Sequence, residues 1–358
     1  MTSSHLKDLA TSRGALATVA LATATAAWTA FKARRAEREH PPKGLFANVD
    51  GIRLHYVDRG AGPPVVLLHG NAVTLDDFHA SGLIERLAKE HRVIAIDRPG
   101  FGHSDRSRNR LWTPAAQAKL IRAALAKLGV ERPVVLGHSM GTMVAMAMAL
   151  EYPDDVGGLV LLGGYYYPTA RLDALLTTPV ALPVLGDVMR YTVTAMASRA
   201  MMNGAVKAMF SPNAVPADFF PALSREMMLR PVQLRANAED AVFMVPAALA
   251  SSKRHGELRM PVTIIAGADD KVVDPVAHSR RLHGDLPQST LIEVPAAGHM
   301  VHYVVPGQIV AAVSAGGEIR RPAAANGRAG DLQTGSSWQE SPPRRAQAWD
   351  AQTALTPV

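Results

Sequence analysis

The chain has 358 residues, of which 48% are hydrophobic and 19% charged, so it can form one sizeable globular domain with insertions or two small domains. It contains no cysteine, which excludes disulfides, thiolate metal sites and cysteine nucleophiles. The net charge is +7, but much of the basic excess lies near the two ends of the chain, so we expect attraction to anionic lipid or simple solubility, and no nucleic-acid partner.

Residues 14–31 form an uncharged segment that ends in Trp28 and Phe31 and is followed at once by basic residues. Its length is at the lower limit for crossing a bilayer, and Ala and Thr make it only marginally apolar. We predict a leader over 1–43 with a membrane anchor at 14–31. Because more Lys and Arg follow the anchor than precede it, the rest of the chain would stay in the cytoplasm. The alternatives are a cleaved signal peptide, hence export, and an amphipathic or disordered leader, hence a soluble cytoplasmic protein.

Residues 44–163 alternate between short apolar strands and helical segments. Asp50-Gly51 predicts a hairpin turn between the first two strands. Strands alternating with helices of this length indicate a mostly parallel sheet covered by helices on both faces, which is an α/β fold. The expected strands lie at 64–70, 92–97, 134–138 and 158–162, and the expected helices at 75–89, 114–128 and after Ser139.

Residues 164–253 break this alternation, because the segment is helical in pattern and rich in proline and methionine. We predict a helical lid inserted between two strands. Its methionines could form a deformable lining for a substrate or could be ordinary core packing. The core of the fold would therefore comprise 44–163 and 254–315, with strands at 260–267 and 290–294 and helices at 275–283 and 304–315. The composition of 316–358 predicts a disordered tail.

Gly137, Ser139 and Gly141 form a Gly-x-Ser-x-Gly turn between an apolar strand and a helical segment. The motif alone is a weak match, but a strand before it and a helix after it are the context of a nucleophile elbow, in which a strained serine projects its hydroxyl above the strand ends. The first peptide N–H of the helix, that of Met140, would face a developing oxyanion.

A serine hydroxyl needs a base, and the base usually needs a carboxylate that orients it. His299 is the expected base, because it follows the last strand and so lies at the same sheet edge as Ser139; His302 is expected in the next helix. His69 is expected to brace its loop, and the His138 side chain to point elsewhere. The loop at 267–275 offers three carboxylates, and the residue pattern alone leaves the choice open between Asp269, Asp270 and Asp274.

The run from 44 to 315 resembles the α/β-hydrolase superfamily in five motifs, namely HGN at 69–71, DRPGFGHSD at 97–105, GHSMG at 137–141, GADDKVV at 267–273 and GHMVH at 298–302. The resemblance implies that Asp270 is the acid, with Asp274 as a helix cap, and that the chain order Ser, Asp, His is that of this fold. It also implies that the second oxyanion donor is the backbone N–H of Asn71, with Ala72 as the alternative. The loop at 97–105 is expected to be structural, at the rim of the pocket.

Haloalkane dehalogenases and epoxide hydrolases share the HGN and DRPGFGHSD motifs, but their nucleophile is an aspartate where this chain has Ser139. We therefore expect acyl transfer on small to medium apolar esters, with Ser139, Asp270 and His299 as the triad and with no metal or cofactor. Arg190, Arg225 and Arg235 are candidates for an anion clamp. Carbon–carbon bond hydrolysis, lactonase, acyltransferase or perhydrolase activity on the same triad stays open, as does a ligand receptor with a vestigial triad.

Overall fold

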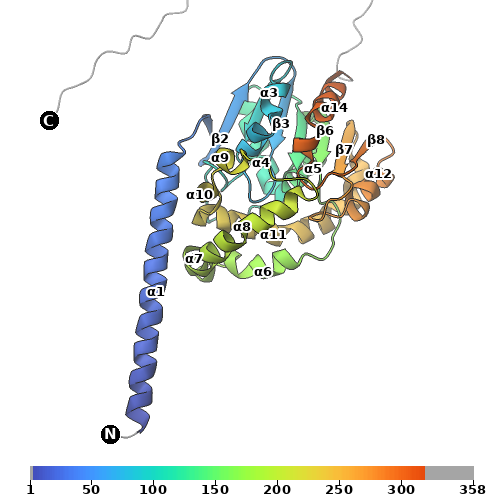
Figure 1. Cartoon of the computed structure of the whole chain (residues 1–358). Helices are drawn as coiled ribbons and strands as arrows, with labels where there is room; N and C mark the ends of the chain where they lie inside the picture. Colours follow the sequence, from blue (N-terminus) through green and yellow to red (C-terminus); the bar gives the residue numbers. More distant parts are fainter. Residues whose placement is uncertain (1–2, 319–358) are drawn as a thin grey trace, which may run out of the picture. The chain divides into compact units, whose positions relative to one another are not determined.

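The computed structural model describes residues 3–318, so the predicted tail lies outside the described residues from position 319 onward. Its centre is an 8-stranded sheet with the order β1-β2-β4-β3-β5-β6-β7-β8 (Figure 1). Neighbouring strands are parallel except for the pairs β1–β2 and β2–β4, which confirms the predicted mostly parallel sheet. The strands are β1 (Leu45–Val49), β2 (Ile52–Arg59), β3 (Pro64–Leu68), β4 (Arg92–Ile96), β5 (Val134–His138), β6 (Gly158–Leu162), β7 (Val262–Gly267) and β8 (Ser289–Val294).

Strands β1 and β2 form the predicted hairpin. Asp50 and Gly51 have φ angles of 49° and 75°, the two positive values that a tight two-residue hairpin turn requires. Asp and Gly tolerate this conformation better than other residues, so the turn could be predicted from two positions alone.

Each central strand contributes side chains to two separate apolar layers, because successive residues of a strand point to opposite faces. In β3, Val65 and Leu67 pack with the layer under α2 (Asp76–Ala80), α3 (Leu83–Leu87) and α14 (Pro306–Glu318). Val66 and Leu68 pack with the layer under α4 (Pro114–Lys127), α5 (Met140–Glu151) and α12 (Arg281–Asp285). Both faces of the sheet are therefore covered, as predicted.

The helix predicted over 75–89 is instead two short helices, α2 (Asp76–Ala80) and α3 (Leu83–Leu87). The break falls at Gly82, which adopts the left-handed conformation with φ 68°. Glycine adopts a positive φ at little cost, so Gly82 allows the chain to change direction between the two helices.

The remaining helices of the core lie close to their expected positions. Helix α4 (Pro114–Lys127) starts after Thr113, whose side chain accepts a hydrogen bond from the Ala116 N–H (3.2 Å). The last predicted helix starts earlier and ends later than expected, as α13 (Val301–Val304) and α14 (Pro306–Glu318), interrupted before Pro306. The other elements are α5 (Met140–Glu151), η1 (Pro153–Asp155), a π-helical turn η3 (Val276–Arg280) and α12 (Arg281–Asp285).

Between the neighbouring strands β6 and β7 the chain leaves the sheet and forms a helical insertion. Most of its helices lie together on one side of the core (Figure 1). The insertion contains α6 (Leu172–Ala181), α7 (Leu185–Tyr191), α8 (Val193–Phe210), α9 (Phe219–Leu223), α10 (Arg225–Met228) and α11 (Pro231–Ser251), and the turn η2 (Ser252–Glu257) leads back to the sheet.

The predicted apolar segment 14–31 lies inside one long helix, α1 (Ser3–Glu39). Within the described part of the chain, this helix is long and apolar enough to cross a membrane from Gly14 to Glu39, with a mean hydropathy of 1.4. The helix packs against α7 and α10 of the insertion.

Candidate active site

Ser139 occupies a strained turn between β5 and α5. Its backbone has φ 51° and ψ −119°, a conformation that residues with a side chain rarely adopt. The Ser139 N–H donates a hydrogen bond to the carbonyl of Leu162 at the end of β6 (2.9 Å). A methyl group on Gly141 would lie 2.0 Å from the carbonyl oxygen of Leu68, so only glycine allows α5 to approach β3 this closely.

Asp270 and His299 form a buried hydrogen-bonded pair. The Asp270 Oδ2 atom lies 2.8 Å from His299 Nδ1. The other carboxylate oxygen of Asp270 accepts hydrogen bonds from the N–H groups of Val272 (2.8 Å) and Val273 (3.0 Å), which fix the carboxylate in place. With Nδ1–H donating to the carboxylate, the lone pair of His299 lies on Nε2, the atom that a general base uses.

A short chain of contacts joins Ser139 to this pair. The Ser139 N–H is hydrogen-bonded to the carbonyl of Leu162, and Gly163 follows Leu162 in the chain. A methyl group on Gly163 would lie 3.4 Å from His299 Nδ1 and 3.5 Å from Asp270 Oδ2. The ends of β5, β6, β7 and β8 therefore bring Ser139, Asp270 and His299 to one edge of the sheet.

The loop at 69–72, directly after β3, carries the two predicted alternatives for the oxyanion donor, and we call it the oxyanion loop. The N–H of Ala72 donates a hydrogen bond to Asn237 Oδ1 on α11 (2.8 Å), so it is already occupied. The Asn71 side chain donates to the carbonyl of Asn237 (3.4 Å). Within residues 3–318, the backbone N–H groups of Asn71 and Met140 have no hydrogen-bond acceptor.

Arg98 supports the oxyanion loop through hydrogen bonds, a role that the sequence analysis missed. Its side chain is fully buried and donates hydrogen bonds to the carbonyls of His69 (2.8 Å) and Gly70 (3.0 Å) and to Asn71 Oδ1 (3.1 Å). It also forms an ion pair with Asp240 of α11 (2.5 Å), which is buried as well. The loop at 97–105 is thus structural, as expected, but it acts on the oxyanion loop and on the insertion together. No local pattern in the sequence signals contacts between residues so far apart.

His69 has the bracing role that we expected. Its Nδ1–H donates to the carbonyl of Gly70 (2.7 Å), and its Nε2 accepts a hydrogen bond from the N–H of Arg98 (2.9 Å). Burial lowers the pKa of His69 to about 4, and the Arg98 charge acts in the same direction. The ring is therefore neutral at pH 7 and serves as a fixed spacer between two loops.

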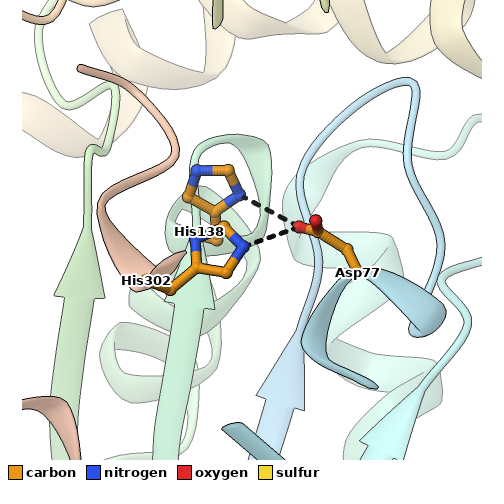
Figure 2. Close-up of side chains that lie close together, drawn as sticks. All are labelled: Asp77, His138 and His302. Carbon is orange, nitrogen blue, oxygen red and sulfur yellow. Dashed lines mark hydrogen bonds and ion pairs between the residues drawn. The ribbon is translucent and has the colours of Figure 1, made fainter. Parts of the chain in front are cut away.

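Asp77, His138 and His302 form a second buried cluster next to His299 (Figure 2). His302 Nε2 lies 2.9 Å from Asp77 Oδ2, and His138 Nδ1 lies 4.0 Å from the same oxygen. These ligand atoms all lie within 4.8 Å of one another, so the cluster could hold a metal ion by distance alone. The Tyr303 hydroxyl donates to the other Asp77 oxygen (2.8 Å), so hydrogen bonds within the protein already use both carboxylate oxygens.

This cluster fixes the position of the His299 loop. His138 Nε2 donates a hydrogen bond to the carbonyl of His299 (3.1 Å), and the two rings lie 4.9 Å apart. Burial lowers the pKa of His138 well below its usual value, and the neighbouring histidines add to the effect, so the ring is neutral. As expected, His302 belongs to a helix, α13, and His138 points to the carbonyl of His299.

The other sequence candidates have partners of their own. Asp274 accepts hydrogen bonds from the N–H groups of Val276 (2.8 Å) and Ala277 (3.3 Å), which is the predicted helix-capping role, while Asp269 is exposed. The three arginines suggested as an anion clamp are paired, Arg190 with Asp187, Arg225 with Asn203 and Arg235 with Glu239.

Two apolar clusters of the insertion touch the loops of the site. In one, Met244 of α11 packs with Met140, Tyr165 and Val273. Met140 directly follows Ser139 at the elbow, and Val273 lies in the loop that carries Asp270. In the other, methionines and aromatic residues from α8 to α10 pack with Val73 and Met300, which follow the oxyanion loop and His299. Of the methionines in the insertion, Met202, Met209 and Met228 pack in this second cluster, whereas Met201 is exposed.

A family model described as alpha/beta hydrolase fold matches residues 63–306. The chain is 28% identical to haloalkane dehalogenase 2 of Mycobacterium bovis, over 73% of this chain and 90% of that protein. It is 26% identical to 2-hydroxy-6-oxo-6-phenylhexa-2,4-dienoate hydrolase of Burkholderia cepacia, over 73% of this chain and 88% of the relative. Among solved structures, an esterase from Exiguobacterium antarcticum matches with a TM-score of 0.63 and 20% identity, covering 76% of this chain and 99% of the esterase.

Proposed function

Because the chain belongs to the α/β-hydrolase family, we propose that it is a serine hydrolase that cleaves ester-type substrates through an acyl-enzyme. The observation that carries the proposal is the hydrogen bond of 2.8 Å between Asp270 and His299, located at the sheet edge where Ser139 stands in its strained turn. A serine, a histidine and a buried carboxylate in this order have the roles of nucleophile, base and orienting acid.

In the proposed reaction, His299 Nε2 takes the proton of the Ser139 hydroxyl while the oxygen attacks the ester carbonyl carbon. The backbone N–H groups of Asn71 and Met140 stabilise the resulting oxyanion. His299 then protonates the departing alcohol, and the acyl group remains on Ser139. A water molecule, deprotonated by the same histidine, then attacks the acyl carbon. His299 returns this proton to the departing Ser139 oxygen as the acid is released, and Asp270 keeps the imidazole in the required tautomer throughout.

The surroundings of the site favour an apolar acyl or alcohol group. Met140, Met244 and Val273 belong to a buried apolar cluster beside the elbow, and the candidate clamp arginines are paired elsewhere. We propose that the insertion acts as a lid over small to medium apolar esters. Its helix α11 is hydrogen-bonded to the oxyanion loop through Asn237, so a movement of α11 would displace the loop that carries the Asn71 donor.

We further propose that α1 anchors the enzyme in a membrane. The helix meets the length and hydropathy needed to cross a bilayer, and Lys32, Arg34 and Arg35 follow its apolar segment, which favours a cytoplasmic catalytic domain.

The relatives suggest two other reactions on this scaffold. Displacement of a halide, the activity in the name of the Mycobacterium relative, is disfavoured because Ser139 stands where a dehalogenase has an aspartate nucleophile. Hydrolysis of a carbon–carbon bond, suggested by the name of the Burkholderia relative, is compatible with the same triad and is our second candidate.

Hydrolysis of p-nitrophenyl esters of increasing acyl length by the full chain in detergent tests the proposal, together with labelling by a fluorophosphonate. We expect turnover and labelling in the wild type and in the matched control Ser252→Ala, and neither in Ser139→Ala. Labelling without ester turnover would favour the carbon–carbon hydrolase or a ligand receptor. A folded wild type that neither turns over nor reacts would refute the triad.

A further inference from the structure

Large apolar side chains are exposed along α6, α7 and the start of α8. Leu176 and Val184, for example, are 78% and 76% exposed. Helix α7 packs against both α6 and α8, so these side chains belong to one continuous part of the insertion. Single exposed apolar residues are normal, but a concentration of them marks an interaction surface. We call the exposed side chains of this part of the insertion, Leu175, Leu176, Val184, Leu185, Val188 and Val193, the α6–α7 apolar face.

The charged residues of α7 are paired, so they do not counteract the apolar character of this helix. Asp187 and Arg190, the charged residues of α7, form an ion pair with each other, and Arg190 is buried. Arg108 lies 2.8 Å from the other oxygen of Asp187. A carboxylate with two cationic partners is easier to bring close to a low-dielectric phase than an unpaired one.

The α6–α7 apolar face adjoins the candidate membrane helix. Helix α1 packs against α7, and α7 packs against α6. In Figure 1, α7 lies beside α1, nearer to the N-terminal end of α1 than α10 does, and α6 lies next to α7. Trp28, which belongs to the apolar segment of α1, stacks under Arg199 of α8 at 4.9 Å. The insertion therefore reaches the level of the apolar segment.

Polar contacts hold α1 against the insertion. Glu37 pairs with Arg230 (2.9 Å), and Lys32 pairs with Glu226 of α10 (3.5 Å). Residues 14–21, in contrast, are exposed along their whole length. The helix is therefore docked by its C-terminal half, and its free apolar half extends beyond the contacts with the insertion.

We propose that the α6–α7 apolar face is immersed in the lipid bilayer beside α1. Because α1 is docked on α7 and α10, inserting its apolar segment into a membrane brings α7 to the surface of the same membrane. There the exposed leucines and valines leave water for the acyl-chain region, which is favourable for side chains of this kind. The inference rests on the proposed membrane anchor, and it makes the insertion a second membrane contact.

The absence of cysteine from the chain allows a direct test, because one introduced cysteine can be labelled with the polarity-sensitive dye NBD. We would label Leu176→Cys, Val184→Cys and Val188→Cys in the full chain. Val19→Cys in α1 reports on the anchor, and Leu45→Cys at the start of β1 is the matched control, because Leu45 is an exposed leucine outside the face. The labelled chains are reconstituted in vesicles of phosphatidylcholine and phosphatidylglycerol with and without doxyl-labelled lipid.

We expect doxyl lipid to quench NBD at the three face positions and at position 19 by about two-fold or more, and to leave position 45 unchanged. Quenching at 19 without quenching at the face would overturn the proposal and keep the anchor. A blue-shifted but unquenched dye at the face would mean a protein partner, such as a second copy, and would also overturn it. If position 19 is unquenched, the anchor and this inference both fail, whereas ester hydrolysis by the same samples reports separately on the proposed chemistry.

Discussion

Replacing Arg98 with methionine should destabilise the fold strongly, because this guanidinium joins three parts of the chain that are far apart in the sequence. It is fully buried, and it donates to the loop of His69 and Gly70, to Gln117 (3.0 Å) and to the carboxylate of Asp240. Methionine keeps most of the volume of the side chain but none of its donors. The change therefore isolates the polar contribution.

The expected cost is about 3–5 kcal/mol, the usual result of removing one partner from a buried ion pair. Asp240 would retain Arg106 (3.0 Å) and Gln117 (3.1 Å) on its other oxygen, so we expect a value toward the lower end of this range. In the double variant Arg98→Met/Asp240→Asn the stranded charge is gone as well. We expect the double variant to recover about 1–3 kcal/mol relative to the sum of the two single changes.

Guanidinium unfolding of the full chain in detergent, followed by circular dichroism, measures these differences. The matched control is Arg122→Met, because Arg122 forms an ion pair with Asp155 in which the two side chains are 46% and 44% exposed. A surface pair of this kind contributes at most about 1 kcal/mol. If Arg98→Met unfolds with the same free energy as the control, the bracing role of Arg98 is wrong. If Arg98→Lys folds but hydrolyses esters as fast as the wild type, the link from Arg98 to the oxyanion loop is wrong.

Three further predictions test other parts of the structure. Asp270→Asn should lower kcat by about 10²–10⁴-fold with little change in KM, because an amide no longer holds the imidazole in the tautomer that leaves Nε2 free as the base. An unchanged kcat in steady-state assays would remove Asp270 from the triad. Gly141→Ala should abolish or severely weaken folding, because the added methyl would lie 2.0 Å from a carbonyl oxygen. Gly204→Ala, at an exposed position of α8 with nothing within 4 Å of the added methyl, should stabilise the fold by about 0.5–1 kcal/mol in the same unfolding assay. Burial holds the pKa of His69 at about 4 against 6.5 in the unfolded chain, so below pH 6.5 the unfolded chain binds a proton that the folded chain does not. The free energy of unfolding should therefore fall as the pH drops from 6.5 toward 4, by about 2 kcal/mol for this residue at pH 5, and His69→Gln should lose that share of the pH dependence; an identical dependence in both proteins would contradict the neutral, buried His69.

Local rules of sequence were sufficient for the strands, most helices and the turn at Ser139. A strand buried on both faces is a short apolar run, and a hairpin turn needs Asp-Gly or a similar pair, so each can be recognised from a few adjacent residues. The same holds for the elbow, where two glycines flank the serine because no larger residue fits. The single helix predicted over 75–89 was wrong for an equally local reason. Glycine can either continue a helix or end it, and the neighbours of Gly82 in the sequence do not show which.

Chain order also predicted that the candidate triad residues lie close together. In a parallel sheet the carboxyl ends of the strands share one edge, so residues that follow β5, β7 and β8 must meet there. The choice of Asp270 among three carboxylates needed the family resemblance. In the structure Asp270 is hydrogen-bonded to His299, while Asp274 caps a helix.

By itself, therefore, the sequence determined most of the elements, the parallel sheet and the segments from which the candidate catalytic residues come, because these follow from the conformations of neighbouring residues and from chain order. Tertiary structure alone decided that Arg98 supports the oxyanion loop, that Asn237 occupies the N–H of Ala72, and that α1 docks on the insertion. These contacts join side chains separated by tens to hundreds of residues. Their partners depend on how helices pack in space, which no spacing along the chain encodes.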